Sequence, residues 1–126
     1  MILLDSNIVI YLRDPTIGQA IADQLGSERL ATCNIIIAEV LGFSELEEAD
    51  ARYFEQLFAT MKNHLLNDVV TSRTIEMRRI QNIQLPDAII AATAITSDLT
   101  LWTHNTDDFN KIHGLRLFDP LADRRS

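Results

Sequence analysis

The sequence predicts a single α/β domain in which a central parallel sheet of four to five strands has helices on both faces. Short apolar runs alternate along the chain with longer segments of helical spacing, and this alternation is typical of a parallel sheet. The chain has 126 residues, of which 47% are hydrophobic, and this is enough for one hydrophobic core. Only residues 121–126 have the composition of a tail, so we expect the domain to span residues 1–120.

The first half of the chain begins with a strand that ends at a carboxylate. Residues 2–4 are apolar and suit a short strand covered on both faces, and Asp5 can cap a helix that starts near Asn7. The other elements predicted for this half are a helix over 16–25 that stops at Gly26, a strand over 29–32, a helix from Asn34 to Phe43, and a helix over 47–65.

The second half of the chain is expected to complete the sheet. Its short apolar runs predict strands over 68–71, 99–103 and 115–118. Helices are predicted over 72–83 and from Pro86 to about residue 96, with a short helical turn over 107–112. Folds of this kind bind their ligands beyond the carboxyl ends of the strands, where Asp5 and the segment 103–108 are expected to lie.

The charge and cysteine content exclude several classes of protein. The chain has 11 Lys and Arg against 18 Asp and Glu, so its net charge of −7 has the wrong sign for holding nucleic acid by bulk electrostatics. A polyanionic substrate would therefore need local cations. The single Cys33 cannot form an internal disulfide, and the sequence shows neither a signal-peptide leader nor a membrane span of about 20 apolar residues. We expect a cytoplasmic protein with no membrane partner.

Four carboxylates stand beside apolar strands or inside apolar helices: Asp5, Glu39, Asp87 and Asp108. Three of them, each considered on its own, have an ordinary structural explanation. Asp5 can act as a helix cap, Asp87 lies in a first helical turn where negative charge is favoured, and Asp108 can be a turn residue.

Glu39 is the exception because it interrupts an apolar helical segment. An unpaired ionised carboxylate in such surroundings costs on the order of several kcal/mol or becomes neutral. Glu39 therefore needs a partner. One candidate is an arginine brought in by folding, such as Arg13 or Arg73, and the other is a divalent metal shared with the remaining carboxylates.

A shared metal would explain how several carboxylates can lie at one place, since they would otherwise raise one another's pKa. Ligation by oxygen atoms alone favours a hard ion, Mg²⁺ with Mn²⁺ as a substitute. The sequence contains no group of Cys and His residues with the spacing of a zinc site.

The four carboxylates lie in four short segments. They are Asp5-Ser6-Asn7 after the first strand, Ile36-Ile37-Ala38-Glu39-Val40, Leu85-Pro86-Asp87-Ala88-Ile89-Ile90-Ala91-Ala92-Thr93-Ala94, and Leu101-Trp102-Thr103-His104-Asn105-Thr106-Asp107-Asp108-Phe109. These segments closely resemble, in the same order, the acidic motifs of PIN-domain nucleases. More narrowly, they look like the motifs of VapC-type toxins of prokaryotic toxin–antitoxin pairs.

The resemblance implies a PIN-like nuclease domain that is a Mg²⁺-dependent endoribonuclease, commonly homodimeric and silenced by a cognate antitoxin. Its catalytic and metal-binding set would be the four carboxylates Asp5, Glu39, Asp87 and Asp108, and its supporting polar residues Asn7, Thr103 and Asn105. We expect Asp5 and Asp87 to bind the ion directly, while the other two act through water or a second ion.

Two positions depart from the usual motifs. Ser6 stands where Thr is usual and keeps the hydroxyl, and in the fourth motif Asn105, Asp107 and Asp108 compete for one acidic role, for which we rank Asp108 first. His104 lies close to this site, but no neighbour in the sequence is a clear partner for it, so it is not included in the catalytic set.

Two alternative functions belong to other classes. A receiver-like phosphoacceptor domain has a similar length and an acidic Mg²⁺ pocket, but it needs a paired acidic motif after the first strand and a lysine at the end of the last one, where this chain has Asp5-Ser6-Asn7 and no lysine. A noncatalytic binding module with the same fold is the other alternative, and the complete set of carboxylates argues against it.

Overall fold

The computed structural model describes residues 1–122. Over this range it contains the following elements in chain order: β1 (Ile2–Leu4), α1 (Ser6–Tyr11), α2 (Ile17–Leu25), β2 (Leu30–Cys33), α3 (Asn34–Leu41), α4 (Glu48–Ala59), β3 (Lys62–His64), α5 (Asp68–Ile80), α6 (Leu85–Thr96), β4 (Thr100–Trp102), the 3-10 turn η1 (Thr106–Asp108) and β5 (Arg116–Phe118).

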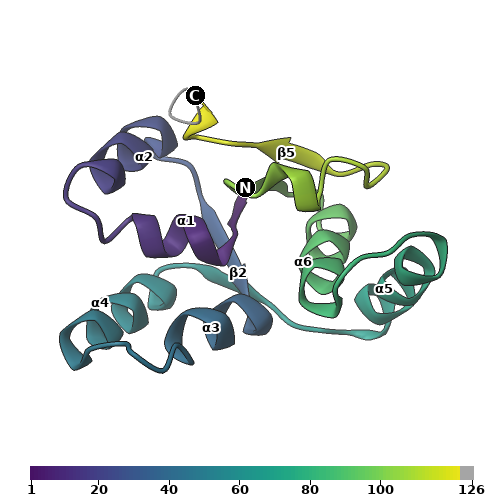
Figure 1. Cartoon of the computed structure of the whole chain (residues 1–126), viewed down its shortest axis with the longest axis horizontal. Helices are drawn as coiled ribbons and strands as arrows, with labels where there is room; N and C mark the ends of the chain where they lie inside the picture. The colour runs from purple at the N-terminus through teal and green to yellow at the C-terminus, as the bar shows by residue number, and fades with distance from the viewer. Residues whose placement is uncertain (123–126) are drawn as a thin grey trace.

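The five strands form one parallel sheet with the order β3-β2-β1-β4-β5. Connections between parallel strands are almost always right-handed, so a change in the direction of strand addition moves the connecting helices to the opposite face. Helices α1 to α4 accordingly lie on one side of the sheet, and α5 and α6 lie on the other (Figure 1). The predicted parallel sheet with helices on both faces is confirmed.

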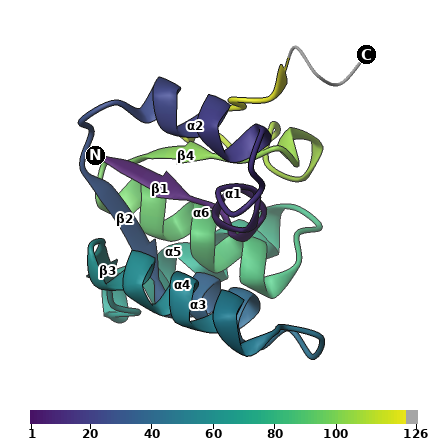
Figure 2. The same cartoon turned by 90° about the vertical axis from the view of Figure 1, so that its left-hand side faces the viewer.

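The strand order reverses between β1 and β4. From β1 the chain builds outward through β2 to β3, and it then returns to add β4 and β5 on the other side of β1. In open parallel sheets, ligands bind beyond the carboxyl ends of the strands at such a point of reversal. Here β1 runs directly into α1 (Figure 2), with Asp5 as the residue between them, and Thr103 is the residue that follows β4.

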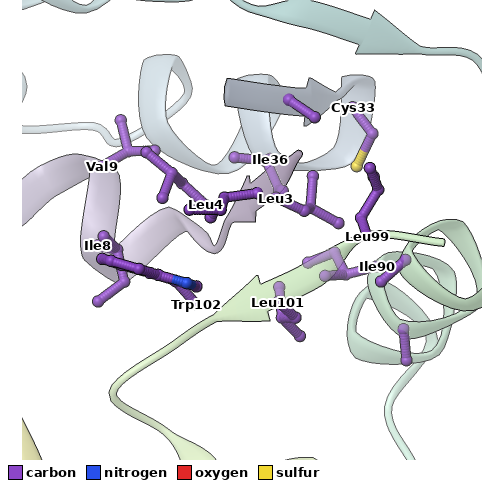
Figure 3. Packing of buried hydrophobic residues seen from close by; sticks show 14 of the residues in the cluster. Leu3, Leu4, Ile8, Val9, Cys33, Ile36, Ile90, Leu99, Leu101 and Trp102 are labelled. Atoms are coloured by element: carbon purple, nitrogen blue, oxygen red, sulfur yellow. The ribbon is translucent and has the colours of Figure 1, made fainter. Parts of the chain in front are cut away.

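The hydrophobic core lies around the two central strands. Leu3, Leu4 and Leu101 are fully buried, and they pack with Ile36 of α3 and Ile90 of α6 (Figure 3). Helix α6 is buried over all residues from Ala88 to Ala94, as expected for a helix that is apolar on every side. This burial fixes the position of its first turn, which carries Asp87.

The sequence-based assignment of residues 62–71 is wrong. Residues 68–71, predicted as a strand, form the first turn of α5, because the Asn67 side chain caps this helix by accepting a hydrogen bond from Val70 N at 2.9 Å. The third strand is instead Lys62–His64, which was placed inside a longer helix. It lies at the edge of the sheet, where polar side chains remain in solvent and leave no apolar pattern.

A second correction concerns Asn34. It was expected to cap α3, but the cap position is Cys33, and Asn34 Oδ1 accepts a hydrogen bond from Asn63 Nδ2 of β3 at 2.7 Å. The predicted boundary between the domain and a tail at 120/121 stays a prediction. Leu121 is buried in the core, and residues 123–126 of the predicted tail lie outside the described residues. Within residues 1–122 no helix is both long enough and apolar enough to cross a membrane.

Candidate active site

Asp5 lies at the carboxyl end of β1 and is only 4% exposed. Its Oδ2 accepts a hydrogen bond from the Thr103 hydroxyl at 2.7 Å, and its Oδ1 accepts one from the backbone N–H of Ser6 at 2.8 Å. Burial raises the pKa of Asp5, and these hydrogen bonds partly offset the shift because they stabilise the ionised form. The carboxylate is therefore held in one orientation at the point where the strand order reverses.

Asn7 connects the start of α1 to the loop after β4. Its Nδ2 lies 3.3 Å from both Asp5 Oδ2 and Thr103 Oγ1, and its Oδ1 accepts a hydrogen bond from the backbone N–H of His104 at 3.1 Å. The backbone N–H of Asn105 donates to Thr103 Oγ1 at 3.1 Å. The three predicted supporting residues thus lie in one hydrogen-bond network around Asp5, with Asn105 taking part through its backbone.

The other three carboxylates come from three separate elements. Glu39 lies in α3, Asp87 in the first turn of α6, and Asp108 is the last residue of η1. The charge of Asp108 raises the pKa of Asp5, and the charges of Asp5 and Asp87 raise that of Glu39. Glu39, Asp87 and Asp108 therefore each lie close enough to Asp5 for the two charges to repel.

The effect is largest at Asp87. Burial, followed by the charges of Asp5 and Asp108, raises the pKa of Asp87 from 3.8 to about 6. A carboxyl group with such a pKa takes up a proton close to neutral pH when no cation is bound. Strongly shifted pKa values of this kind are typical of functional sites.

Glu39 is exposed, which differs from the expectation of burial in an apolar helix. Only Ile36 and Val40 of α3 are buried, so this helix is covered along one side and Glu39 projects from another. Partial burial and the charge of Asp5 still raise the pKa of Glu39, while a hydrogen bond with the Ser6 hydroxyl lowers it.

None of the four carboxylates is paired with Lys or Arg within residues 1–122. Arg13, one of the arginines considered for Glu39, instead donates to Asp50 at 2.9 Å and lies 4.6 Å above the ring of Tyr53. The hypothesis that Arg13 neutralises Glu39 is therefore wrong.

The side chains present fit a hard divalent cation held by few protein ligands. No three His, Cys, Asp or Glu side chains in the described part of the chain are arranged to enclose an ion by themselves. Mg²⁺, however, typically binds one or two carboxylates and completes its shell with water and substrate phosphate. Carboxylate oxygens that repel one another, and that have no basic partner among residues 1–122, meet this requirement.

Comparison with known proteins agrees with the fold. A family model described as PIN domain matches residues 2–115. The chain belongs to the PIN-domain family. No match is found among curated proteins.

Solved structures resemble this PIN domain over nearly its whole length. A chain of a toxin-antitoxin complex from Klebsiella pneumoniae is 28% identical, with a TM-score of 0.80 over 95% of this chain and 98% of that one. A chain of VapBC-1 from nontypeable Haemophilus influenzae is 26% identical, with a TM-score of 0.80 over the same shares. A chain of VapBC2 from Rickettsia felis, bound to a DNA fragment from its promoter, is 24% identical with a TM-score of 0.79 over 94% and 98%, and shows the fold alone. The resemblance predicted from the motifs is confirmed at the level of family and fold.

The topology of this PIN domain also excludes the receiver-like alternative. Receiver domains have the strand order 2-1-3-4-5, whereas the order here is 3-2-1-4-5. The last strand, β5, moreover ends at Phe118 where a receiver domain would carry a lysine.

Sequence reasoning missed two polar contacts at the site. The Ser6 hydroxyl lowers the pKa of Glu39, which the hydroxyl kept at the second position of the first motif could have suggested. His104 Nδ1 lies 3.1 Å from both carboxylate oxygens of Asp119, a residue 15 positions away that no local pattern connects to it.

Proposed function

We propose that this PIN domain is a metal-dependent endoribonuclease that acts as the toxin of a toxin–antitoxin pair. The proposal is supported chiefly by the charge repulsion between Asp5 and each of Glu39, Asp87 and Asp108, none of which is paired with Lys or Arg within residues 1–122. Such an arrangement is costly unless a cation binds, and PIN-family membership gives that cation a nuclease role.

Asp5 and Asp87 are the proposed direct ligands of Mg²⁺, or of Mn²⁺ in its place. Asp5 is the carboxylate held most firmly, and Asp87 is the one whose charge is most strongly disfavoured without a cation. Glu39 and Asp108 are exposed and are proposed to act through water or a second ion. The ion, when bound, polarises the phosphodiester and makes water a sufficient nucleophile near neutral pH.

The protein's own residues orient and hold this centre. Thr103 and Asn7 fix Asp5, and the backbone of the loop after β4 is bonded to both of them. Asp108 takes the fourth acidic role in the proposal, since its charge acts on both Asp5 and Asp87. No side-chain nucleophile is needed. The divalent cation also offsets the net charge of −7 where the RNA backbone approaches.

An apolar groove among α1, α3 and α4 is proposed to receive the antitoxin. The groove has a volume of about 480 Å³, and the exposed Phe43 is one of its lining residues. Its polar lining includes the carboxylates Asp14, Glu45 and Asp50. An apolar helix or extended segment with a basic side chain suits this combination. The similar Klebsiella chain comes from a toxin-antitoxin complex, and the other two similar chains come from structures of VapBC2 and VapBC-1.

The cytoplasmic location expected from the sequence and the homodimeric state implied by the resemblance remain predictions. A noncatalytic module is the competing function, and the assay described next separates it from a nuclease.

The function is tested by incubating the purified chain with single-stranded RNA and Mg²⁺ or EDTA. We expect internal cleavage that requires the metal and is lost in D5N and D87N, while D23N, a change at a carboxylate of α2 outside the cluster, cleaves like the wild type. Absence of cleavage by wild type, or full cleavage by both site variants, contradicts the proposal. Thermal unfolding of each variant shows whether loss of activity reflects loss of the fold.

A further inference from the structure

His104 and Asp119 form a pair at the same edge of the sheet as the acidic site. They follow the neighbouring parallel strands β4 and β5, so both lie at carboxyl ends. His104 Nδ1 is 3.1 Å from each oxygen of the Asp119 carboxylate. The Asp119 side chain is 7% exposed and that of His104 is 27% exposed. The carboxylate is thus buried, and the imidazole lies between it and solvent.

This contact determines which nitrogen of His104 is free. A carboxylate accepts hydrogen bonds, so Nδ1 carries the hydrogen, and in the neutral ring Nε2 keeps its lone pair. Nε2 has no hydrogen-bond partner among residues 1–122. It is also not among the side-chain atoms that are both buried and without a partner, so it is accessible to solvent. The ring of Tyr11 meets that of His104 edge to face, with centroids 6.0 Å apart, and limits its rotation. The result is an oriented acceptor open to solvent.

His104 is close to the proposed cleavage centre. Its backbone N–H donates to Asn7 Oδ1, and Asn7 Nδ2 lies 3.3 Å from Asp5 Oδ2. Two hydrogen bonds therefore separate the His104 backbone from the carboxylate that is the proposed metal ligand. An RNA strand bound at Asp5 and extending toward β5 would pass the imidazole.

We propose that His104 is a substrate-contacting residue whose Nε2 accepts a hydrogen bond from a ribose 2′-hydroxyl of the RNA, with Asp119 as its positioning residue. This inference rests on the proposed ribonuclease function. A lone-pair acceptor needs a donor, which a phosphate diester does not offer. The N–H groups of the bases donate in RNA and DNA alike, whereas the 2′-hydroxyl donates and is absent from DNA, so only a bond to the 2′-hydroxyl gives a preference for RNA. His104 therefore makes the site prefer RNA to DNA.

The test compares two single-stranded oligonucleotides of one sequence, an RNA and its 2′-deoxy counterpart containing deoxyuridine. Their affinities are measured by fluorescence anisotropy at pH 8 with Ca²⁺ in place of Mg²⁺. We expect wild type to prefer RNA by about threefold to tenfold, the worth of one hydrogen bond. H104A abolishes the preference. H104Q retains part of it because an amide oxygen can accept at the position of Nε2.

Asp119 is examined with D119N, whose amide can bond either tautomer of the imidazole. Part of the His104 population then carries its hydrogen on Nε2, and the preference for RNA falls while the fold is kept. The matched control is H113Q at an exposed histidine away from the site, which should behave as wild type. In Mg²⁺, H104A should raise the KM for RNA more than it lowers kcat.

Three results would overturn the assignment. They are a wild type that binds both oligonucleotides equally, an H104A variant that keeps the preference for RNA, and an H104A variant that weakens RNA and DNA binding by the same factor, which would indicate a phosphate contact. Because binding is measured separately from cleavage, loss of the RNA preference in H104A is distinguishable from absence of ribonuclease activity in the wild type.

Discussion

The hydroxyl of Thr103 donates a 2.7 Å hydrogen bond to Oδ2 of Asp5, although 98 positions separate the two residues in the chain. The parallel pairing of β1 with β4 brings them together, because each follows the last residue of its strand. The most buried carboxylate of the site therefore depends for its orientation on a neutral side chain from the neighbouring strand.

Replacing Thr103 by Val is expected to lower RNA cleavage by about 10–100-fold, since an orienting contact to a proposed metal ligand is lost. Stability should fall by about 1–3 kcal/mol because Asn7 Nδ2 and Asn105 N lose their acceptor. The matched control is T74V, which removes a buried hydroxyl that bonds only its own helix. Equal cleavage by T103V and T74V would contradict the role given to Thr103.

The raised pKa of Asp87 predicts how the metal-free protein responds to pH. A carboxyl with a pKa of about 6 when folded and 3.8 when unfolded binds its proton more tightly in the folded state. Stability in EDTA should therefore rise as the pH falls from 7 to 5 and stop rising near pH 4. The pKa shifts of Asp5 and Glu39 have the same sign and add to this trend.

Thermal unfolding between pH 4 and 8 measures this effect, and D87N should flatten the profile relative to wild type and D23N. Saturating Mg²⁺ should also flatten it, since the cation replaces the proton. A wild-type profile in EDTA whose stability falls from pH 7 to 5 would show that the carboxylates do not repel one another as described.

Phe43 is 56% exposed and lines the groove proposed for the antitoxin. Changing it to Ser should weaken antitoxin binding by about 10-fold or more and leave RNA cleavage by the free protein intact, because apolar anchors in pockets contribute most to such affinities. The control is L65S, which alters an exposed leucine outside the groove. If F43S and L65S bind the antitoxin equally well, the groove is not its docking site.

The cap of α5 gives a prediction about the fold itself. Asn67 Oδ1 accepts from Val70 N, so N67A should lower stability by about 1 kcal/mol, whereas T16A at the cap position of α2, which makes no side-chain cap bond, should change it little. Chemical denaturation compares the two variants. Equal stability of both would mean that the cap does not hold this helix.

The elements with strong apolar patterns could be predicted from the sequence, and those at the sheet edge could not. Strands β1 and β4 are covered on both sides and helix α6 is apolar all round, so their burial is visible in their residues. Strand β3 is polar, and residues 68–71 are rich in β-branched side chains, so local preference pointed to the wrong segment. Pairing with β2 and the Asn67 cap decide the outcome.

The candidate site follows the same distinction. Its acidic residues could be predicted from motifs that stand out against apolar neighbours, and Asn7 and Thr103 from their place beside them. The exposure of Glu39 could not be predicted from the sequence, because it depends on which side of α3 is covered. The pairing of His104 with Asp119 could not be predicted either, because the contact exists only once β4 and β5 lie side by side.

Calorimetric titration of Mg²⁺ into the metal-free protein at pH 7.5 shows whether a divalent cation relieves the repulsion between the site carboxylates. We expect saturable binding to wild type and D23N that is lost in D5N and D87N. Failure of wild type to bind Mg²⁺, or binding by D5N and D87N with wild-type affinity, would contradict this role of the cation.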